Sequence, residues 1–149
     1  MGRAYKWQFH FNAMHNTTPE TEAGKHAHSF LVILWMEIVE LNGDKQNRCE
    51  GKLKNYLKQY TGKYLNELEN FKEKIPTVEV ICETLYYDME KIAEEHGMDL
   101  LQIEVGDSPT ARYILGKRCL LGDTYHWVSD EEFARYKKQV ESECRKAVV

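Results

Sequence analysis

Three histidines stand at positions where a single metal ion could bind all of them. His26 and His28 lie two residues apart in a β-rich run, so both side chains point to the same face of a strand. His15 ends the alternating run before them, and pairing of the two strands would bring it beside that face. Three neutral imidazoles with an open fourth position describe a catalytic zinc site, where the metal polarises a substrate oxygen or activates a water. The alternative is that His26 and His28 are exposed polar residues on the solvent face of a strand.

The remaining histidines have no such neighbours, and we expect them to be structural or surface residues. They are His10, His96 and His126. The four cysteines show no short paired spacing, which argues against a zinc knuckle or a redox motif and favours small buried residues in a reducing compartment. They are Cys49, Cys82, Cys119 and Cys144.

Two strands at the start of the chain must position the three histidines. Trp7 to Met14 alternates apolar and polar side chains, which is typical of a half-buried strand. Residues 16–25 are polar and contain Pro and Gly, so we expect a loop there. A long β-rich run follows from His26 to Leu41, and Asn42-Gly43-Asp44 predicts a turn after it.

Two helices and two further strands follow. Apolar residues at spacings of three and four predict a helix from about Glu50 to Gly62. Pro76-Thr77 opens a second helix that ends before Gly97. Leu101–Val105 and Arg112–Leu115 then read as strands joined by a turn.

The tail adds one more expected helix, because Ser129 and Glu132 form a capping box ahead of an apolar pattern. The whole order is strand, strand, helix, helix, strand, strand and a C-terminal helix. This order predicts an α+β fold.

Length and composition exclude several functional classes. The chain has 149 residues, which fits one domain. Its 20 Lys and Arg against 24 Asp and Glu give a net charge of −4, whereas a nucleic-acid partner usually requires a basic face. The longest apolar run, Phe30–Met36, is far shorter than the ~20 residues that span a bilayer, and no signal segment opens the chain. We therefore expect a cytoplasmic protein with neither a membrane nor a nucleic-acid partner.

Several motifs resemble one enzyme family. Phe9 to His15 resembles the FxFxAxH opening of the 6-pyruvoyl-tetrahydropterin synthase and 6-carboxytetrahydropterin synthase family, and His26 to Phe30 resembles its HGH motif followed by a strand. Pro76 to Glu79 resembles its PTxE helix opening. Ile103 to Ser108 stands where the family has a strand that ends in Glu-Thr, and Tyr113 matches its final tyrosine.

The resemblance implies the tunnelling fold, in which ββααββ subunits with an antiparallel sheet assemble into barrels. We then expect a single domain over residues 1–149, with a core of about 5–116 and a C-terminal extension of about 117–149. It also implies a homo-oligomer, a trimer or a hexamer. By matching positions, His15, His26 and His28 would bind Zn²⁺ and a dihydroneopterin-type pterin would be the substrate.

The chain departs from the family at its catalytic positions. Glu22 stands where the family places a catalytic cysteine, and Thr61 and Gly62 stand where it has an Asp-His pair. Members with a glutamate at that point look like side-chain-cleaving enzymes that release 6-hydroxymethyl-dihydropterin. The resemblance then makes Glu22 the base that removes a hydroxyl proton to start a retro-aldol cleavage, a role that suits a buried carboxylate. The alternative is an ordinary solvated carboxylate beside Glu20.

We expect a carboxylate to bind the pterin ring. The amidine-like edge of a pterin has two N–H donors, and the two oxygens of one carboxylate can accept both. Asp107 continues the strand face of Ile103 and Val105 and takes the place of the family's anchoring glutamate. Glu104 is the alternative if the strand shifts register. Thr77 could help to bind the substrate at a helix start, or it could simply cap the helix.

Three functions follow from these observations. The first is a zinc-dependent lyase that acts on the side chain of a dihydroneopterin-type substrate. The second is a catalytically inactive homologue that retains zinc and binds a pterin or purine, and the third is a structural oligomer with vestigial histidines. The pathway, whether folate, queuosine or biopterin, is left open by the sequence.

Overall fold

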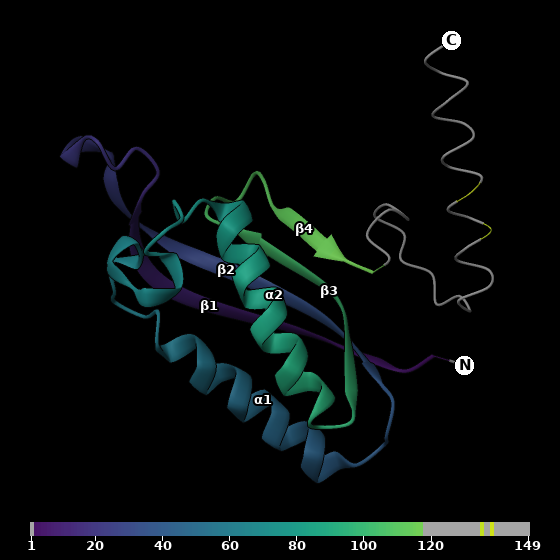
Figure 1. The fold of residues 1–149 in the computed structure, drawn as a ribbon. Coiled ribbons are helices and arrows are strands. Elements are labelled where there is room, and N and C mark those ends of the chain that lie inside the picture. The colour runs from purple at the N-terminus through teal and green to yellow at the C-terminus, as the bar shows by residue number, and fades with distance from the viewer. Residues whose placement is uncertain (1, 118–134, 136–137, 139–149) are drawn as a thin grey trace.

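The computed structural model describes residues 2–117 together with residues 135 and 138 (Figure 1). Arg135 and Lys138 are helical, but the rest of the C-terminal helix predicted from Ser129 lies outside the described residues, as do His126, Cys119 and Cys144. No helix in the described part of the chain is long and apolar enough to cross a membrane.

Four antiparallel strands form one sheet in the order β1-β2-β3-β4. The strands are β1 (Ala4–Asn16), β2 (Lys25–Ile38), β3 (Met98–Gly106) and β4 (Tyr113–Gly116). The first two form a long hairpin whose loop extends beyond the helices at one end of the sheet (Figure 1).

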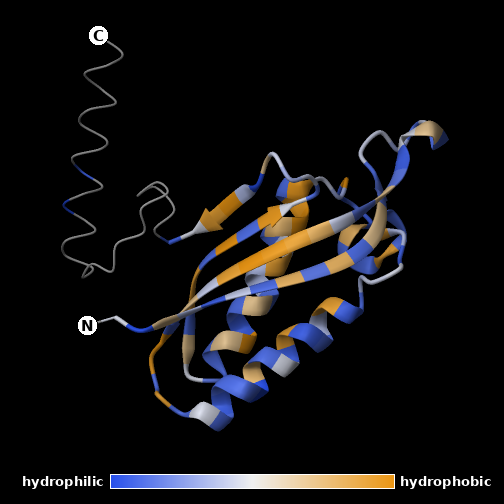
Figure 2. Cartoon of the chain, turned by 180° about the vertical axis from the view of Figure 1, so that it is seen from behind, coloured by the Kyte–Doolittle hydropathy of each residue, from blue (hydrophilic) through white to orange (hydrophobic). Residues whose placement is uncertain are grey.

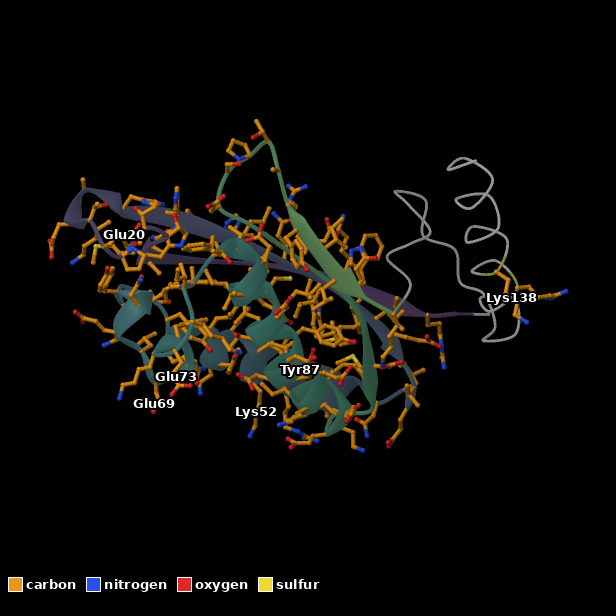
Figure 3. The ribbon with its side chains drawn as sticks, turned by 45° about the horizontal axis from the view of Figure 1, so that its top comes forward. Glu20, Lys52, Glu69, Glu73, Tyr87 and Lys138 are labelled. Atoms are coloured by element: carbon orange, nitrogen blue, oxygen red, sulfur yellow. The ribbon has the colours of Figure 1, made fainter. Side chains whose placement is uncertain are left out.

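Two helices, α1 (Gly43–Lys58) and α2 (Val78–Glu94), cover one face of the sheet (Figure 1). The opposite face carries no helix among the described residues. Lys52 on α1 and Tyr87 on α2 point away from the sheet, so the outer faces of the helices meet solvent (Figure 3). The element order is the ββααββ order expected, and the prediction of an α+β fold is confirmed.

The core lies between the sheet and the two helices. On β1, Phe9, Phe11 and Ala13 are buried on the helix side, while the residues between them are exposed on the other side, as the alternation predicts. β2 carries a long hydrophobic run over residues 30–34 (Figure 2) and lies inside the sheet between β1 and β3. Residues from every layer complete the core: Phe30, Val32, Leu34, Leu53, Leu57, Leu85, Met89 and Ile103.

The predicted start of α1 is wrong, because the helix begins at Gly43 rather than near Glu50. Asn42 is its N-cap, and the Asn42 side chain accepts a hydrogen bond from the Lys45 backbone N–H at 3.1 Å. The first turns of α1 are mostly polar and bury Gln46 and Cys49, so they carry no apolar periodicity. Asn42-Gly43-Asp44, which predict a turn, therefore form the start of α1.

The predicted bounds of α2 are close to those observed. The Thr77 hydroxyl accepts a hydrogen bond from the Val80 backbone N–H at 3.3 Å and caps the helix. Gly97 follows the helix with a φ of 70°, a left-handed conformation that favours glycine. The chain then enters β3 directly, which returns it to the centre of the sheet.

Candidate metal centre

The hairpin of β1 and β2 brings the three predicted metal ligands together. His15 lies directly opposite His26 in the register, and His28 lies opposite Ala13, so all three share the helix side of the sheet. One ring nitrogen from each histidine lies within 4.8 Å of the others. This spacing is close enough for a single ion to draw the three nitrogens into its coordination shell.

His15 supplies the strongest sign that the cluster fits a metal. Its side chain is 1% exposed, and its Nδ1 lies 2.7 Å from the carbonyl oxygen of Pro76. Since a carbonyl can only accept, Nδ1 carries the proton and Nε2 presents a lone pair. That Nε2 is buried without a hydrogen-bond partner among the described residues. A buried acceptor left in this state is costly, and a cation at the centre of the cluster would satisfy it.

His26 is oriented in the same way. Its Nδ1 donates to the carbonyl oxygen of Gly24 at 2.6 Å, which leaves Nε2 free to bind. Gly24 is tightly confined, because a Cβ at this position would collide with the side chains of Thr18 and Asn16. The tight packing of the loop between β1 and β2 therefore fixes the Gly24 carbonyl, which binds the Nδ1 of His26.

Burial lowers the pKa of His15 below its usual 6.5, and the neighbouring His26 and His28 lower it further. The hydrogen bond to Pro76 and the charge of Asp107 both raise this pKa but do not reverse the shift. A metal ligand must be the neutral imidazole, and the environment of His15 favours that form.

Asn16 and Asn66 fix the end of β1 next to His15. The Asn66 side chain accepts from the Asn16 backbone N–H at 2.9 Å and donates to the Asn16 carbonyl at 2.8 Å. The Asn16 side chain in turn donates to the carbonyl of Thr21 and accepts from the backbone N–H of Thr18, both at 2.8 Å. Sequence pattern alone does not identify these two residues as part of the site, since the pair joins positions 50 residues apart.

Asp107 faces the histidines, whereas Glu104 does not. The Asp107 Oδ2 lies 3.8 Å from the Nε2 of His28. The Glu104 carboxylate instead accepts a hydrogen bond from the indole N–H of Trp35 at 2.8 Å. Beside Asp107 a cavity of about 250 Å³ opens between β4 and the start of α2, lined also by Val78, Glu79, Ala111, Arg112 and Tyr113.

Glu22 lies close to the ligands in sequence, whereas Thr77 is distant in sequence but follows the residue that orients His15. Thr77 follows Pro76, whose carbonyl orients His15, and its hydroxyl caps α2. Glu22 begins the short 3-10 turn η1 (Glu22–Gly24) and is exposed. Within the described residues it makes no hydrogen bond or ion pair, which is the behaviour of a solvated carboxylate. Its role as a base stays a prediction.

Thr61 and Gly62, which stand where the resemblance places an Asp-His pair, belong to a segment that binds β1 through its backbone. The backbone N–H of Gly62 donates to the carbonyl of Asn12 at 2.7 Å, and that of Met14 donates to the carbonyl of Lys63 at 2.9 Å. Gly62 adopts a φ of 72°, which suits glycine. This segment runs alongside β1 and offers neither an acid nor an imidazole at the two positions.

Within residues 2–117, the histidines and cysteines outside the cluster are separate from this centre. His10 is exposed, and His96 is buried with its Nδ1 donating to the carbonyl of Ile92 at 2.7 Å, a helix-end contact. Cys49 and Cys82 are buried free thiols. Burial raises the pKa of Cys49 to about 11 and that of Cys82 to about 12, which favours the protonated thiol at neutral pH.

Solved structures share this fold at low sequence identity. A 6-pyruvoyl tetrahydropterin synthase from Caenorhabditis elegans matches with a TM-score of 0.64 and 12% identity, over 78% of this chain and 96% of that one. An uncharacterized protein from Wolinella succinogenes matches with a TM-score of 0.58 and 14% identity, over 78% and 98%. A 6-pyruvoyl tetrahydropterin synthase from Plasmodium falciparum matches with a TM-score of 0.51 and 12% identity, over 78% and 98%.

Sequence comparison agrees with the structural likeness. No curated protein matches the chain significantly. The family model for 6-pyruvoyl tetrahydropterin synthase, however, matches residues 4–117, which include all four strands and both helices. The chain therefore belongs to the 6-pyruvoyl tetrahydropterin synthase family.

Proposed function

We propose that the protein is a zinc-dependent lyase that acts on the side chain of a dihydroneopterin-type pterin. Membership of the family supports a pterin-processing lyase in general. The observation that carries the metal is the buried, unpartnered Nε2 of His15 inside a cluster of three imidazoles. His15, His26 and His28 would hold the ion, which when bound polarises a substrate oxygen.

Glu22 is the proposed base. It belongs to the same short turn as Gly24, whose carbonyl orients His26, so its backbone has a fixed relation to a proposed ligand. The carboxylate would take the proton of a side-chain hydroxyl while the adjacent carbon–carbon bond breaks. The fragment whose hydroxyl lost its proton leaves as an aldehyde. The carbon that stays on the pterin keeps its own hydroxyl and is protonated to give 6-hydroxymethyl-dihydropterin.

Asp107 and Thr77 are the proposed substrate-binding residues. Asp107 borders the 250 Å³ cavity near the histidines, and its carboxylate could accept both N–H donors of the pterin edge. Thr77 lies at the N-terminus of α2 on the same side of the sheet, and its backbone follows directly after the carbonyl that orients His15. Glu104 is the weaker candidate, since its carboxylate already binds Trp35.

A second candidate is a zinc-retaining protein that binds a pterin or purine without turnover. The observation that favours it is the use of Thr61 and Gly62 at the positions of the family's Asp-His pair. The exposure of Glu22 in the single chain also favours it. This candidate predicts ligand-dependent stabilisation without a product, because a ligand that binds only the folded state raises the melting temperature.

Product analysis by mass spectrometry separates the two candidates. Zinc-loaded protein would be incubated with dihydroneopterin triphosphate, alongside Glu22→Ala and the matched control Glu20→Ala. Glu20 is a second exposed glutamate of the same loop (Figure 3). A product of 6-hydroxymethyl-dihydropterin mass, lost in Glu22→Ala and retained in Glu20→Ala, is the expected result. A carboxy- or pyruvoyl-pterin product would contradict the role of Glu22, and no product from zinc-loaded protein would favour the binding protein.

A further inference from the structure

The side chain of Asp107 lies beside the proposed metal centre and also borders the neighbouring cavity. Its Oδ2 is 3.8 Å from the Nε2 of His28, and the two side chains are 31% and 28% exposed. Among the described residues it is the one carboxylate within ion-pair distance of the histidine cluster. Glu79 borders the same cavity but makes no such contact, and Glu104 is bound to Trp35.

The distance fits a shared coordination shell. Zinc bonds to nitrogen and oxygen are about 2.0–2.1 Å long, so neighbouring ligand atoms of a tetrahedral site lie about 3.3 Å apart. The Asp107–His28 separation exceeds this value only slightly, and the three ring nitrogens lie within 4.8 Å of one another. Asp107 lies outside the group of ligand atoms that are all within 4.8 Å of one another, so its side chain would have to rotate toward His15 and His26 to complete the shell.

The backbone around Asp107 is placed firmly enough to present a ligand. Gly106 ends β3 directly opposite Leu31 in the sheet register. A Cβ on Gly106 would come within 2.8 Å of the carbonyl oxygen of Ala111, so the turn after β3 closes tightly on itself. Asp107 is the first residue of that turn, and its half-exposed side chain keeps freedom to rotate.

We propose that Asp107 is the fourth ligand of the metal in the substrate-free protein, and that a substrate oxygen displaces it. This inference rests on the proposed metal centre. A carboxylate opposite three neutral imidazoles lowers the net charge of the centre and closes the position at which foreign ligands would bind. Because Asp107 has a single carboxylate, binding to the metal and binding to the pterin edge exclude each other. When the substrate arrives, Asp107 therefore leaves the metal and binds the pterin edge.

Cobalt substitution of the full chain tests the proposal without reference to activity. The visible spectrum of bound Co²⁺ reports its ligands, and azide serves as a small probe of an open coordination position. Wild type would be compared with Asp107→Ala, with Asp107→Asn, which keeps the side-chain shape, and with the control Glu79→Gln. Circular dichroism would establish that each variant is folded.

We expect the spectrum of cobalt-loaded wild type and of Glu79→Gln to be insensitive to azide. Asp107→Ala and Asp107→Asn should bind cobalt more weakly than wild type, and azide should shift their spectra. A wild-type spectrum that responds to azide as strongly as those of the variants would overturn the proposal, even if the variants bind cobalt weakly. Failure of wild type to bind cobalt would instead overturn the metal centre itself.

Discussion

At the scale of single residues, His15 combines three properties that rarely coincide by chance. It is almost fully buried, one ring nitrogen donates to a backbone carbonyl, and the other has no partner in the described part of the chain. His26 repeats the same pattern of Nδ1 donation at a more exposed position. Histidine ligands of metals characteristically donate their second N–H in this way, so the cluster is organised as a metal site would be.

The lowered pKa of His15 predicts how the metal-free protein responds to acid. The unfolded chain takes up a proton near pH 6.5, whereas folded His15 resists protonation until lower pH. The unfolded state therefore binds more protons in this window, and the free energy of unfolding falls as the pH drops below about 6.5. Urea denaturation of metal-free protein between about pH 8 and pH 5 measures this slope. His15→Asn should flatten it, and His10→Asn, which changes an exposed histidine, should leave it unchanged.

At the scale of elements, one hairpin and the start of one helix build the site. β1 and β2 carry the three histidines, and the residue before the N-cap of α2 supplies the carbonyl for His15. The segment 62–66 lies alongside the end of β1, where Met14 and Tyr64 form a parallel bridge. Asn66, in this segment, ties the residue after His15 in place. The position of His15 thus depends on contacts that are far apart in the sequence.

Loss of the Asn66 side chain should weaken both the fold and the metal site. Asn66→Ala leaves the N–H and carbonyl of Asn16 without their partners, and unsatisfied buried groups of this kind cost about 1–3 kcal/mol. Chemical denaturation should show this loss, and a cobalt titration should show weaker binding because His15 is less well held. Gln59→Ala, which removes one exposed amide contact to Tyr56, is the control. Equal stability of the two variants would contradict the role given to Asn66.

Thr77 should behave as a helix cap whatever its contact with substrate. Thr77→Ala removes the acceptor for the Val80 N–H and should lower the free energy of unfolding by about 1 kcal/mol. Thr77→Ser keeps the hydroxyl and should restore stability. Thermal or urea denaturation of the three proteins measures the difference, and an alanine variant as stable as wild type would be the contrary result.

Much of this arrangement could be predicted from the sequence, because local patterns encode it. The alternation of Trp7 to Met14, the His26–His28 spacing and the Pro76-Thr77 helix start are all short-range signals. Each element is present, although β1 begins at Ala4 and β2 ends at Ile38 rather than Leu41. The start of α1 could not be predicted, since its first turns are polar and Asn42 reads equally as a turn or a cap. The Asn16–Asn66 pair and the approach of Asp107 to His28 depend on tertiary contacts with no local pattern.

At the scale of the whole molecule, the sheet is covered unevenly. Both helices pack on one face, while the other carries Ile33, Trp35 and the exposed Ile114 with no helix over them in the described residues. β1 and β4 are the two edges of the sheet among residues 2–117, and the segment 62–66 lies alongside the end of β1. Exposed sheet edges tend to pair with other chains, so this shape supports the proposed homo-oligomer.

Sedimentation velocity at micromolar concentration should find a trimer or a hexamer. Ile114 is 41% exposed on edge strand β4, and placing a charge there should disfavour contact between copies. Ile114→Lys should therefore shift the protein toward smaller species, whereas Lys52→Glu, on the outer face of α1, should not (Figure 3). A monomeric wild-type protein would contradict assembly through the sheet.

The metal content and ligand environment of the purified protein test the proposed metal centre most directly. Elemental analysis of protein refolded with zinc, combined with zinc X-ray absorption, should find one zinc per chain bound by several imidazoles and no sulphur. His26→Ala should lose most of this zinc, and His10→Ala should keep it. Zinc bound through sulphur, or equal zinc in the two variants, would contradict the claim that His15, His26 and His28 form the metal centre.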